Sequence, residues 1–123
     1  MDVNSFFKDV INQNRSALPA YFCEDAVIRW HCTNEQFSLS EYVQANCDYP
    51  GKWKGGIERT EEFGSTIVVV GKVFSEDESI SCHVTSFIKL KDDKISELDE
   101  YWADDTEAPL WRKKLGIGKF LRF

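Results

Sequence analysis

The sequence has no hydrophobic run of the length that a membrane-spanning helix requires. Its longest aliphatic run is Ile67–Val70, whereas a spanning helix needs about 20 apolar residues. Residues Met1–Asn4 lack the positive charge of an export signal, and Lys8 and Asp9 interrupt the apolar stretch that would have to follow. We therefore expect a cytoplasmic protein without a membrane partner.

The four cysteines lack the spacing of a metal site or a redox motif. Cys23, Cys32, Cys47 and Cys82 form no C-x-x-C pair, and neither histidine stands at zinc-finger spacing from them. Without an export signal, a disulfide framework is also disfavoured. We expect small buried side chains at these positions, no metal site and no cofactor, with a reactive thiol as the alternative.

Basic residues are in deficit and are unevenly placed. The chain has 15 Lys and Arg against 21 Asp and Glu, a net charge of −6, which argues against nucleic acid as a partner. Residues 109–123 nevertheless carry five basic residues and no acidic one, interleaved with Trp111, Phe120 and Phe123. Such a segment most simply packs on the acidic body or on a neighbouring subunit.

What is present suffices for one globular domain. Of the 123 residues, 42% are hydrophobic and 29% charged, and a chain of this length buries roughly two-thirds of its unfolded surface. No repeat, low-complexity stretch or linker divides it. We therefore predict a single domain over residues 1–123, with residues 109–123 as a basic tail.

Three helices are predicted in the first half of the chain. Apolar residues at helical spacing predict an amphipathic helix over Asp2–Asn14. Ser16 can cap a short second helix that ends at Phe22. Ser38 and Glu41 have the spacing of a capping box and begin a third helix, which Pro50 and Gly51 stop.

Strands dominate the rest of the sequence. Ala26–Cys32 alternates, with Ala26, Ile28, Trp30 and Cys32 on one face. Four further strands follow the third helix, separated by short turns: Ile57–Phe63, Ser65–Phe74, Ile80–Leu90 and Lys94–Ala103. Strands gathered after helices indicate an α+β fold, in which a curved antiparallel or mixed sheet carries three N-terminal helices over its concave face.

The order of these elements, together with the closing pattern Lys94–Trp102, resembles the nuclear transport factor 2-like superfamily and its SnoaL-like branch, which includes polyketide cyclases. Tyr21–Val27 is similar to the segment leading into that family's first strand. Trp30–Asn34, Ala45–Gly51 and Asp99–Trp102 resemble a bacterial group of the superfamily. The resemblance implies a cone-shaped sheet (the cystatin-like roll), a small ligand in the mouth of the cone, and a homodimer formed through the outer sheet face.

Carrying over catalytic residues from this family leaves Glu100 as the candidate. The resemblance to limonene epoxide hydrolase places that enzyme's last-strand aspartate at Glu100, but the strand Thr66–Phe74 offers only Lys72 as a partner. In ketosteroid isomerase, the surroundings of two carboxyl groups tune their pKa values for catalysis. The resemblance to this enzyme places its general base at Trp30 and its acid near Ser86. Neither side chain can perform that chemistry.

Glu100 shares a strand face with Leu98 and Trp102. If this face looks into the cone, burial among apolar walls raises the pKa of the carboxyl and prepares it for general acid or base catalysis. In the alternative, Glu100 is exposed or only pairs with a cation such as Arg29, Lys72 or one in the tail.

Aromatic and polar residues on the same faces predict a binding pocket. Trp30, Tyr42 and Trp102 are expected to line it, with Ser86 and Asn46 orienting the ligand; the aromatic residues being plain core is the alternative. We predict a protein that binds a small, largely apolar or aromatic molecule, with cofactor-free isomerase, cyclase or hydrolase chemistry by Glu100 left open. The alternative is a non-catalytic ligand sensor or a dimeric interaction module.

Two histidine–cysteine pairs invite a test for nucleophilic catalysis. His31 precedes Cys32, and His83 follows Cys82. Adjacent residues of a strand point to opposite faces, so an imidazole cannot reach its neighbouring thiol. We expect both histidines on the outer face of the sheet.

Overall fold

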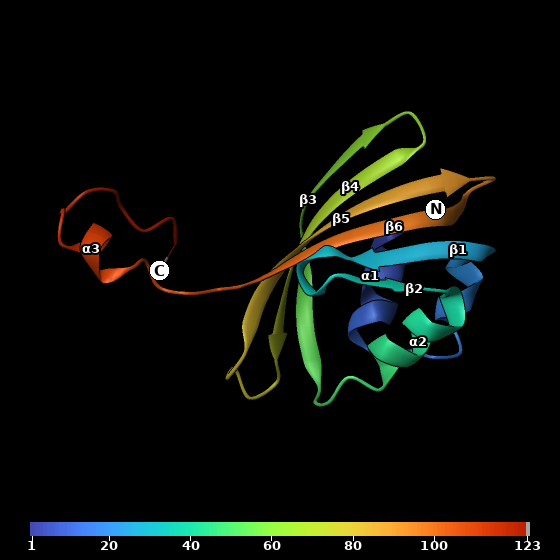
Figure 1. The fold of residues 1–123 in the computed structure, drawn as a ribbon, viewed down its shortest axis with the longest axis horizontal. Coiled ribbons are helices and arrows are strands. Elements are labelled where there is room, and N and C mark those ends of the chain that lie inside the picture. The colour runs from blue at the N-terminus through green and yellow to red at the C-terminus, as the bar shows by residue number, and fades with distance from the viewer. Residues whose placement is uncertain (123) are drawn as a thin grey trace.

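Six strands form one curved sheet, with the order β2-β1-β6-β5-β4-β3 (Figure 1). This computed structural model describes residues 1–122; Phe123, which we assigned to the basic tail, lies outside the described residues. Neighbouring strands are antiparallel except for β1 and β6, which pair in parallel, so the sheet is mixed. The strands are β1 (Phe22–Trp30), β2 (Glu35–Phe37), β3 (Trp53–Phe63), β4 (Thr66–Ser75), β5 (Ser81–Lys91) and β6 (Lys94–Asp104).

Two α-helices and a short 3-10 helix cover the concave side of the sheet (Figure 1). Helix α1 (Val3–Ile11) begins after Asp2, whose carboxylate accepts hydrogen bonds from the first-turn N–H groups. Helix α2 (Leu39–Cys47) begins with the predicted capping box. The second predicted helix is the single 3-10 turn η1 (Leu18–Tyr21). The α+β class, the curved sheet and the concave-side helices of the sequence analysis are confirmed.

The hydrophobic core lies between the concave face of the sheet and the helices. Side chains alternate along β4 and β5, so that one parity is buried and the other is half-buried or exposed. Four residues at the centre of the core are 0% exposed, namely Leu18, Ile28, Ile95 and Leu98. Along β5, Val84, Ser86 and Ile88 are buried, so this parity faces the core.

Helix α1 packs closely against β4 at a glycine. A Cβ atom added to Gly71 would lie 2.4 Å from Cζ of Phe7, closer than any real Cβ contact. Phe7 is itself 8% exposed and belongs to a cluster with Ile11, Val73 and Val84. The missing side chain of Gly71 therefore sets how near α1 comes to the sheet.

The first strand differs from its predicted bounds at both ends. It begins at Phe22 and ends at Trp30, and His31–Thr33 forms the 3-10 helix η2 instead of continuing the strand. Asn34 then adopts the left-handed conformation with φ 57°, which turns the chain back so that β2 pairs antiparallel with β1. Cys32, expected at the end of a strand, therefore lies in a turn at the rim of the sheet.

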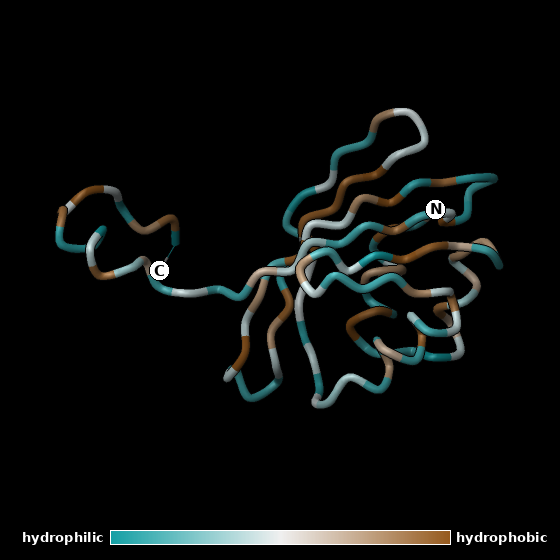
Figure 2. Tube along the Cα trace, in the orientation of Figure 1, coloured by the Kyte–Doolittle hydropathy of each residue, from teal (hydrophilic) through white to brown (hydrophobic). Residues whose placement is uncertain are grey.

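The C-terminal segment, Asp105–Arg122, extends away from the rest of the molecule after β6 (Figure 1). It contains one short helix, α3 (Leu110–Lys113), and Figure 2 shows hydrophobic stretches along it. Near the end of the segment, the Arg122 guanidinium binds the Glu58 carboxylate on β3 at 3.2 Å. Within the described residues, no helix combines the length and the apolar character needed to cross a membrane.

Candidate functional site

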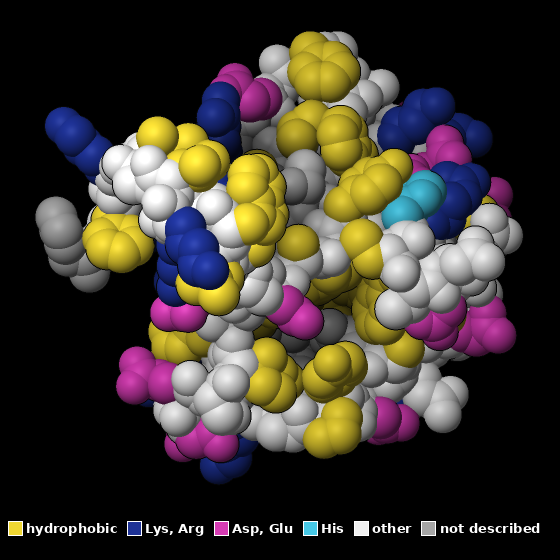
Figure 3. All heavy atoms as spheres, turned by 60° about the vertical axis from the view of Figure 1, so that its left-hand side comes forward, with side chains coloured by type: hydrophobic (Ala, Val, Ile, Leu, Met, Phe, Trp, Pro, Cys, Tyr) yellow, Lys and Arg dark blue, Asp and Glu magenta, His cyan; other side chains and the backbone are white. Residues whose placement is uncertain are grey.

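An open cavity of about 410 Å³ occupies one end of the cone. Figure 3 shows a hollow on this side of the molecule, bordered by hydrophobic side chains. Its walls come from α1, the β1–η2–β2 region, the end of α2, and the strand ends of β3 to β6. The lining residues are Val10, Ile11, Gln13, Trp30, Cys32, Thr33, Glu35, Asn46, Tyr49, Trp53, Val73, Ile80, Cys82, Trp102 and Asp104.

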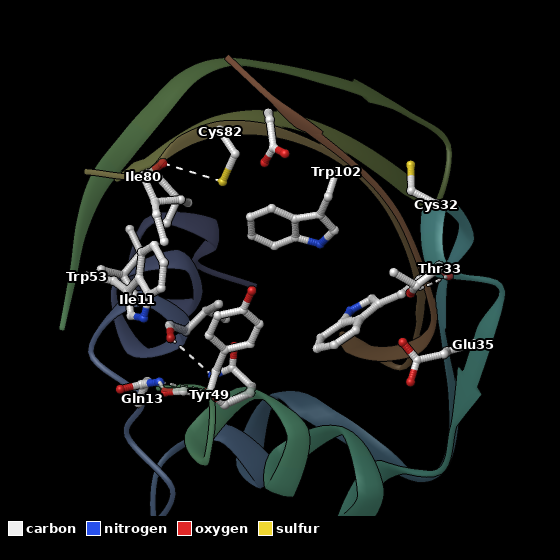
Figure 4. Close-up of a pocket in the computed structure, with 15 residues that line it drawn as sticks. Ile11, Gln13, Cys32, Thr33, Glu35, Tyr49, Trp53, Ile80, Cys82 and Trp102 are labelled. Carbon is white, nitrogen blue, oxygen red and sulfur yellow. Dashed lines mark hydrogen bonds between the residues drawn. The ribbon is translucent and has the colours of Figure 1, made fainter. Parts of the chain in front are cut away.

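Aromatic rings form much of the cavity wall. In Figure 4, the rings of Tyr49 and Trp102 project into the space, with Trp53 beside Ile80 on one flank. Tyr49 packs edge-to-face on Trp53 at 5.5 Å between ring centroids. Trp30 is fixed in the same manner by Phe37 at 4.8 Å. These contacts hold flat apolar surfaces around an empty volume, which suits an aromatic or aliphatic molecule.

Few polar groups reach the cavity, and the charged ones among them are all acidic. The Asn46 amide donates to the Val10 carbonyl at 3.1 Å, and the Gln13 amide donates to the Asn46 carbonyl at 3.0 Å. Both side chains thus join α1 to α2. Glu35 and Asp104 are acidic, and no Lys, Arg or His is among the described residues that line the cavity. The cavity therefore disfavours anions.

Glu100 lies on the inner face of β6, where the strand register places it between two partners. It stands opposite Trp30 of β1 and opposite Ser86 of β5. The Trp30 indole donates to Oε1 of Glu100 at 3.1 Å, and the Ser86 hydroxyl donates to Oε2 at 2.5 Å. Each carboxylate oxygen therefore has a donor from a neighbouring strand.

Burial dominates the electrostatics of this carboxyl group. Glu100 is 5% exposed, and the loss of hydration raises its pKa, although hydrogen bonds from Ser86, Trp30 and Trp102 oppose the change. Tyr42 is 1% exposed, and its hydroxyl has no hydrogen-bond partner among the described residues. Burial, followed by the nearby charge of Glu100, raises the pKa of Tyr42 as well.

Glu100 does not line the large cavity. It borders a separate void of about 10 Å³ beneath α1, together with Ser86 and Trp102, and such a volume is at the lower limit for one water molecule. Trp30 and Trp102 line the large cavity. The carboxyl is therefore connected to the cavity through two indole rings.

The predicted site residues divide between three places. Trp30, Asn46 and Trp102 line the large cavity, while Ser86 and Glu100 border the small void. Tyr42 is part of the closed core, where it packs against Phe22 and Trp30.

Of the residues that line the cavity, the sequence analysis named only Trp30, Asn46 and Trp102 as site residues; Tyr49, Trp53 and Ile80 are among those it missed. Tyr49 and Ile80 lie outside helices and strands, where periodicity carries no information. Trp53 is the first residue of β3 and stands opposite Ser75 on the inner face of the sheet.

The outer face of the sheet carries a second group of side chains. Phe87 and Tyr101 are 40% and 45% exposed and contact each other edge-to-face at 6.0 Å. His31 stacks on Tyr101 at 4.4 Å, and its Nε2 lies 2.7 Å from Asp99. His83 also points outward, as expected, and contacts Glu58 at 3.1 Å and Asp105.

The cysteines and acidic residues form no metal site. All four cysteines are free, and Cys32 is exposed at the cavity rim instead of buried as expected. Across residues 1–122, no group of three His, Cys, Asp or Glu side chains has the arrangement to hold a metal ion.

Several solved structures have the same fold as this chain. A protein of Kribbella flavida DSM 17836, provisionally named a ketosteroid isomerase, is 19% identical with a TM-score of 0.81, covering 98% of this chain and 87% of that one. An NTF-2 like protein of unknown function from Burkholderia xenovorans LB400 is 16% identical with a TM-score of 0.78, covering 96% and 91%. A protein of Shewanella putrefaciens CN-32, provisionally named a SnoaL-like polyketide cyclase, is 11% identical with a TM-score of 0.66, covering 80% and 75%.

These similarities confirm the resemblance noted in the sequence: the chain has the nuclear transport factor 2-like fold, shared with ketosteroid isomerase-like and SnoaL-like proteins. No protein-family model matches the chain, and no curated protein matches its sequence. Function on such a fold has to be argued from the site itself.

Proposed function

We propose that the protein binds a small, largely apolar or aromatic molecule, neutral or cationic, in the cavity of about 410 Å³. The observation that carries this proposal is the combination of an open volume, an aromatic wall and two carboxylates without a basic side chain among the described lining residues. Ligand sites are commonly clefts of roughly 300–1,000 Å³ with mainly apolar walls. The acidic rim makes a molecule with a negative charge a poor occupant.

In this proposal Glu100 is a positioning residue. Its carboxylate receives the Trp30 N–H, and hydrogen bonding to the Trp102 side chain lowers its pKa. Both indole rings line the cavity. The carboxylate thereby fixes the angle at which the two rings face a ligand. Asn46 acts similarly from the other side, because its amide holds the end of α2 against α1.

Acid/base chemistry by Glu100 is the second candidate. The observation in its favour is a buried carboxyl with a raised pKa near the Tyr42 hydroxyl, which has no hydrogen-bond partner among residues 1–122. A buried carboxyl whose pKa is raised holds its proton more tightly than a free one, as a general acid must. For catalysis, a substrate must reach past the two indole rings into the space beside Ser86. Binding without reaction is therefore the function that the geometry supports best.

A neutral hydrophobic dye tests the binding proposal. We expect Nile red to bind the purified protein saturably and with one site per chain. Cys82→Trp should weaken this binding at least about tenfold, because the larger ring occupies part of the cavity at the position of the Cys82 side chain. Phe63→Trp is the matched control, since Phe63 is 60% exposed on the β3–β4 turn. Absence of saturable binding, or equal loss in both variants, contradicts the proposal.

We further propose a homodimer formed through the outer face. The outward side chains of β4, at even positions from Thr66 to Phe74, are half-buried in the single chain, and together with Phe87 and Tyr101 they leave an apolar surface uncovered. The apolar character of β4 at both parities is accounted for when a second copy covers this face.

A further inference from the structure

The C-terminal segment carries more exposed apolar surface than a lone chain should leave in water. Six of its side chains are between 58% and 93% exposed, and none of them belongs to the core clusters. Exposed apolar groups at this density mark a surface that another molecule covers. The six are Leu110, Trp111, Leu115, Ile117, Phe120 and Leu121.

The cavity mouth has the complementary composition. Tyr49 and Ile80 on its rim are 55% and 48% exposed, and its charged members, Glu35 and Asp104, are both acidic. The charged side chains of the segment from Pro109 to Arg122 are all basic. Arg122 pairs with Glu58 and Lys113 with Glu107 of the same chain, so the charges that this match uses are those of Arg112, Lys114 and Lys119. An apolar, cationic segment therefore matches an apolar, anionic mouth in both properties.

The first residue of the segment, Asp105, is held so that the segment leads away from the chain's own cavity. The Asp105 N–H donates to the Ser81 carbonyl at 2.9 Å, which continues the β5–β6 pairing beyond Asp104. The Asp105 carboxylate also accepts from the Ser81 hydroxyl at 2.6 Å and contacts His83. These bonds direct the chain outward along β6 (Figure 1).

We propose that the C-terminal segment of one copy docks across the cavity mouth of a second copy. Its apolar side chains lie on Tyr49 and Ile80, and its basic side chains face Glu35 and Asp104. The cavity is then completed by the other copy, and the exchanged segment selects which molecules enter it. This inference deepens the proposed function, because it rests on the cavity being the binding site.

An exposed native thiol allows a direct test. Cys32 lies at the mouth and is exposed, so a second thiol introduced in the segment by Ile117→Cys can form a disulfide with it. The full-length, ligand-free protein is oxidised mildly, and the products are separated on a non-reducing gel and mapped by mass spectrometry. We expect a covalent dimer, linked between Cys32 and the introduced thiol, that forms at least tenfold faster than in the control variant Phe63→Cys.

Two variants sharpen this measurement. Cys32→Ser combined with Ile117→Cys should lose the covalent dimer, and Glu35→Lys combined with Ile117→Cys should slow its formation severalfold through like-charge repulsion. A linked product with the mass of one chain means that the segment closes its own cavity, which overturns the exchange. Linkage no faster than in Phe63→Cys overturns docking at the mouth.

These outcomes are separate from those of the proposed function. The cross-linking uses no ligand, so Nile red binding can succeed while the cross-link fails, and then only the exchange is overturned. Light scattering on the same protein reports the dimer independently. A non-covalent dimer in which Cys32 does not become linked to the introduced thiol supports the outer-face contact and contradicts the docking of the segment at the mouth.

Discussion

The Trp30 indole donates a hydrogen bond of 3.1 Å to the Glu100 carboxylate, its direct partner across the parallel β1–β6 pair. The strands that come first and last along the chain, β1 and β6, are thus joined by side chains as well as by their backbones. The same indole also forms part of the cavity wall. A substitution of Glu100 should therefore affect both the stability of the fold and the shape of the cavity.

Glu100→Gln should remove a pH dependence from the stability of the protein. The pKa of Glu100 is raised in the folded state above 4.5 by burial, so the folded protein holds this proton more tightly than the unfolded chain. The contribution to the free energy of unfolding is fully present below pH 4.5 and is lost as the pH rises through the folded pKa. The free energy of unfolding, measured with urea across this pH range, should fall more steeply with rising pH for the wild type than for Glu100→Gln.

Glu100→Leu supplies the comparison for that variant. The leucine leaves the Trp30 N–H and the Ser86 hydroxyl without acceptors, which should cost about 1–3 kcal/mol of unfolding free energy. Equal pH profiles for wild type and Glu100→Gln would show that the carboxyl titrates alike in the folded and unfolded states, contrary to this account.

Asp105→Asn should lower the pKa of His83. The hydrogen bond that the His83 ring donates to the Asp105 carboxylate raises this pKa above 6.5, with a further contribution from Glu58, although burial opposes both. The stabilisation from His83 is therefore present below pH 6.5 and is lost as the pH rises through the folded value. NMR titration of the imidazole measures the shift directly. A pKa that stays unchanged in Asp105→Asn would exclude Asp105 as its cause.

Gly71→Ala should destabilise the protein by about 1–3 kcal/mol, because the added methyl overlaps the Phe7 ring. Phe7→Leu in the same chain should recover part of this loss, so that the double variant is more stable than the sum of the two single changes indicates. Chemical denaturation measures all three. Gly56→Ala is the control, since a Cβ there meets no atom within 4 Å, and strict additivity would disprove the contact.

Phe87→Asp should weaken the proposed homodimer. Phe87 is 40% exposed at the centre of the outer face, and a carboxylate there would have to lose its hydration on association. Light scattering over a dilution series should give a dissociation constant at least about tenfold higher than for the wild type. Ser40→Asp, exposed at the start of α2 on the concave side, should leave the constant unchanged. If both variants dimerise equally well, the interface lies elsewhere.

Periodicity in the sequence was sufficient to predict most of the elements. The helical spacing in Asp2–Asn14 and the alternation in Ile80–Leu90 correspond to α1 and β5, because each element buries one face. Strand β2 was missed, since three residues are too few to display a period of two. The 3-10 helix after Trp30 was also missed, because it depends on the left-handed conformation of Asn34.

The candidate site was predictable only in part. Trp30 and Trp102 were found because strand parity assigns them to the concave face, which the structure places at the cavity. Parity alone does not say how deep along the cone a residue lies. Tyr42 and Glu100 share that interior but lie at its closed part, whereas Tyr49 and Ile80 reach the mouth from loops.

The parallel pairing of β1 with β6 also constrains how the chain can fold during synthesis. The second edge of β1, residues 22–30, can be paired only after residues 95–100 have been synthesised. In contrast, β3, β4 and β5 can pair as successive hairpins as soon as each is made. Closing a loop of this length before its contacts form slows folding. A ribosome-bound chain that ends before β6 therefore exposes two unpaired strand edges, on β1 and β5, and we expect chaperones that recognise extended apolar segments to engage it at that stage.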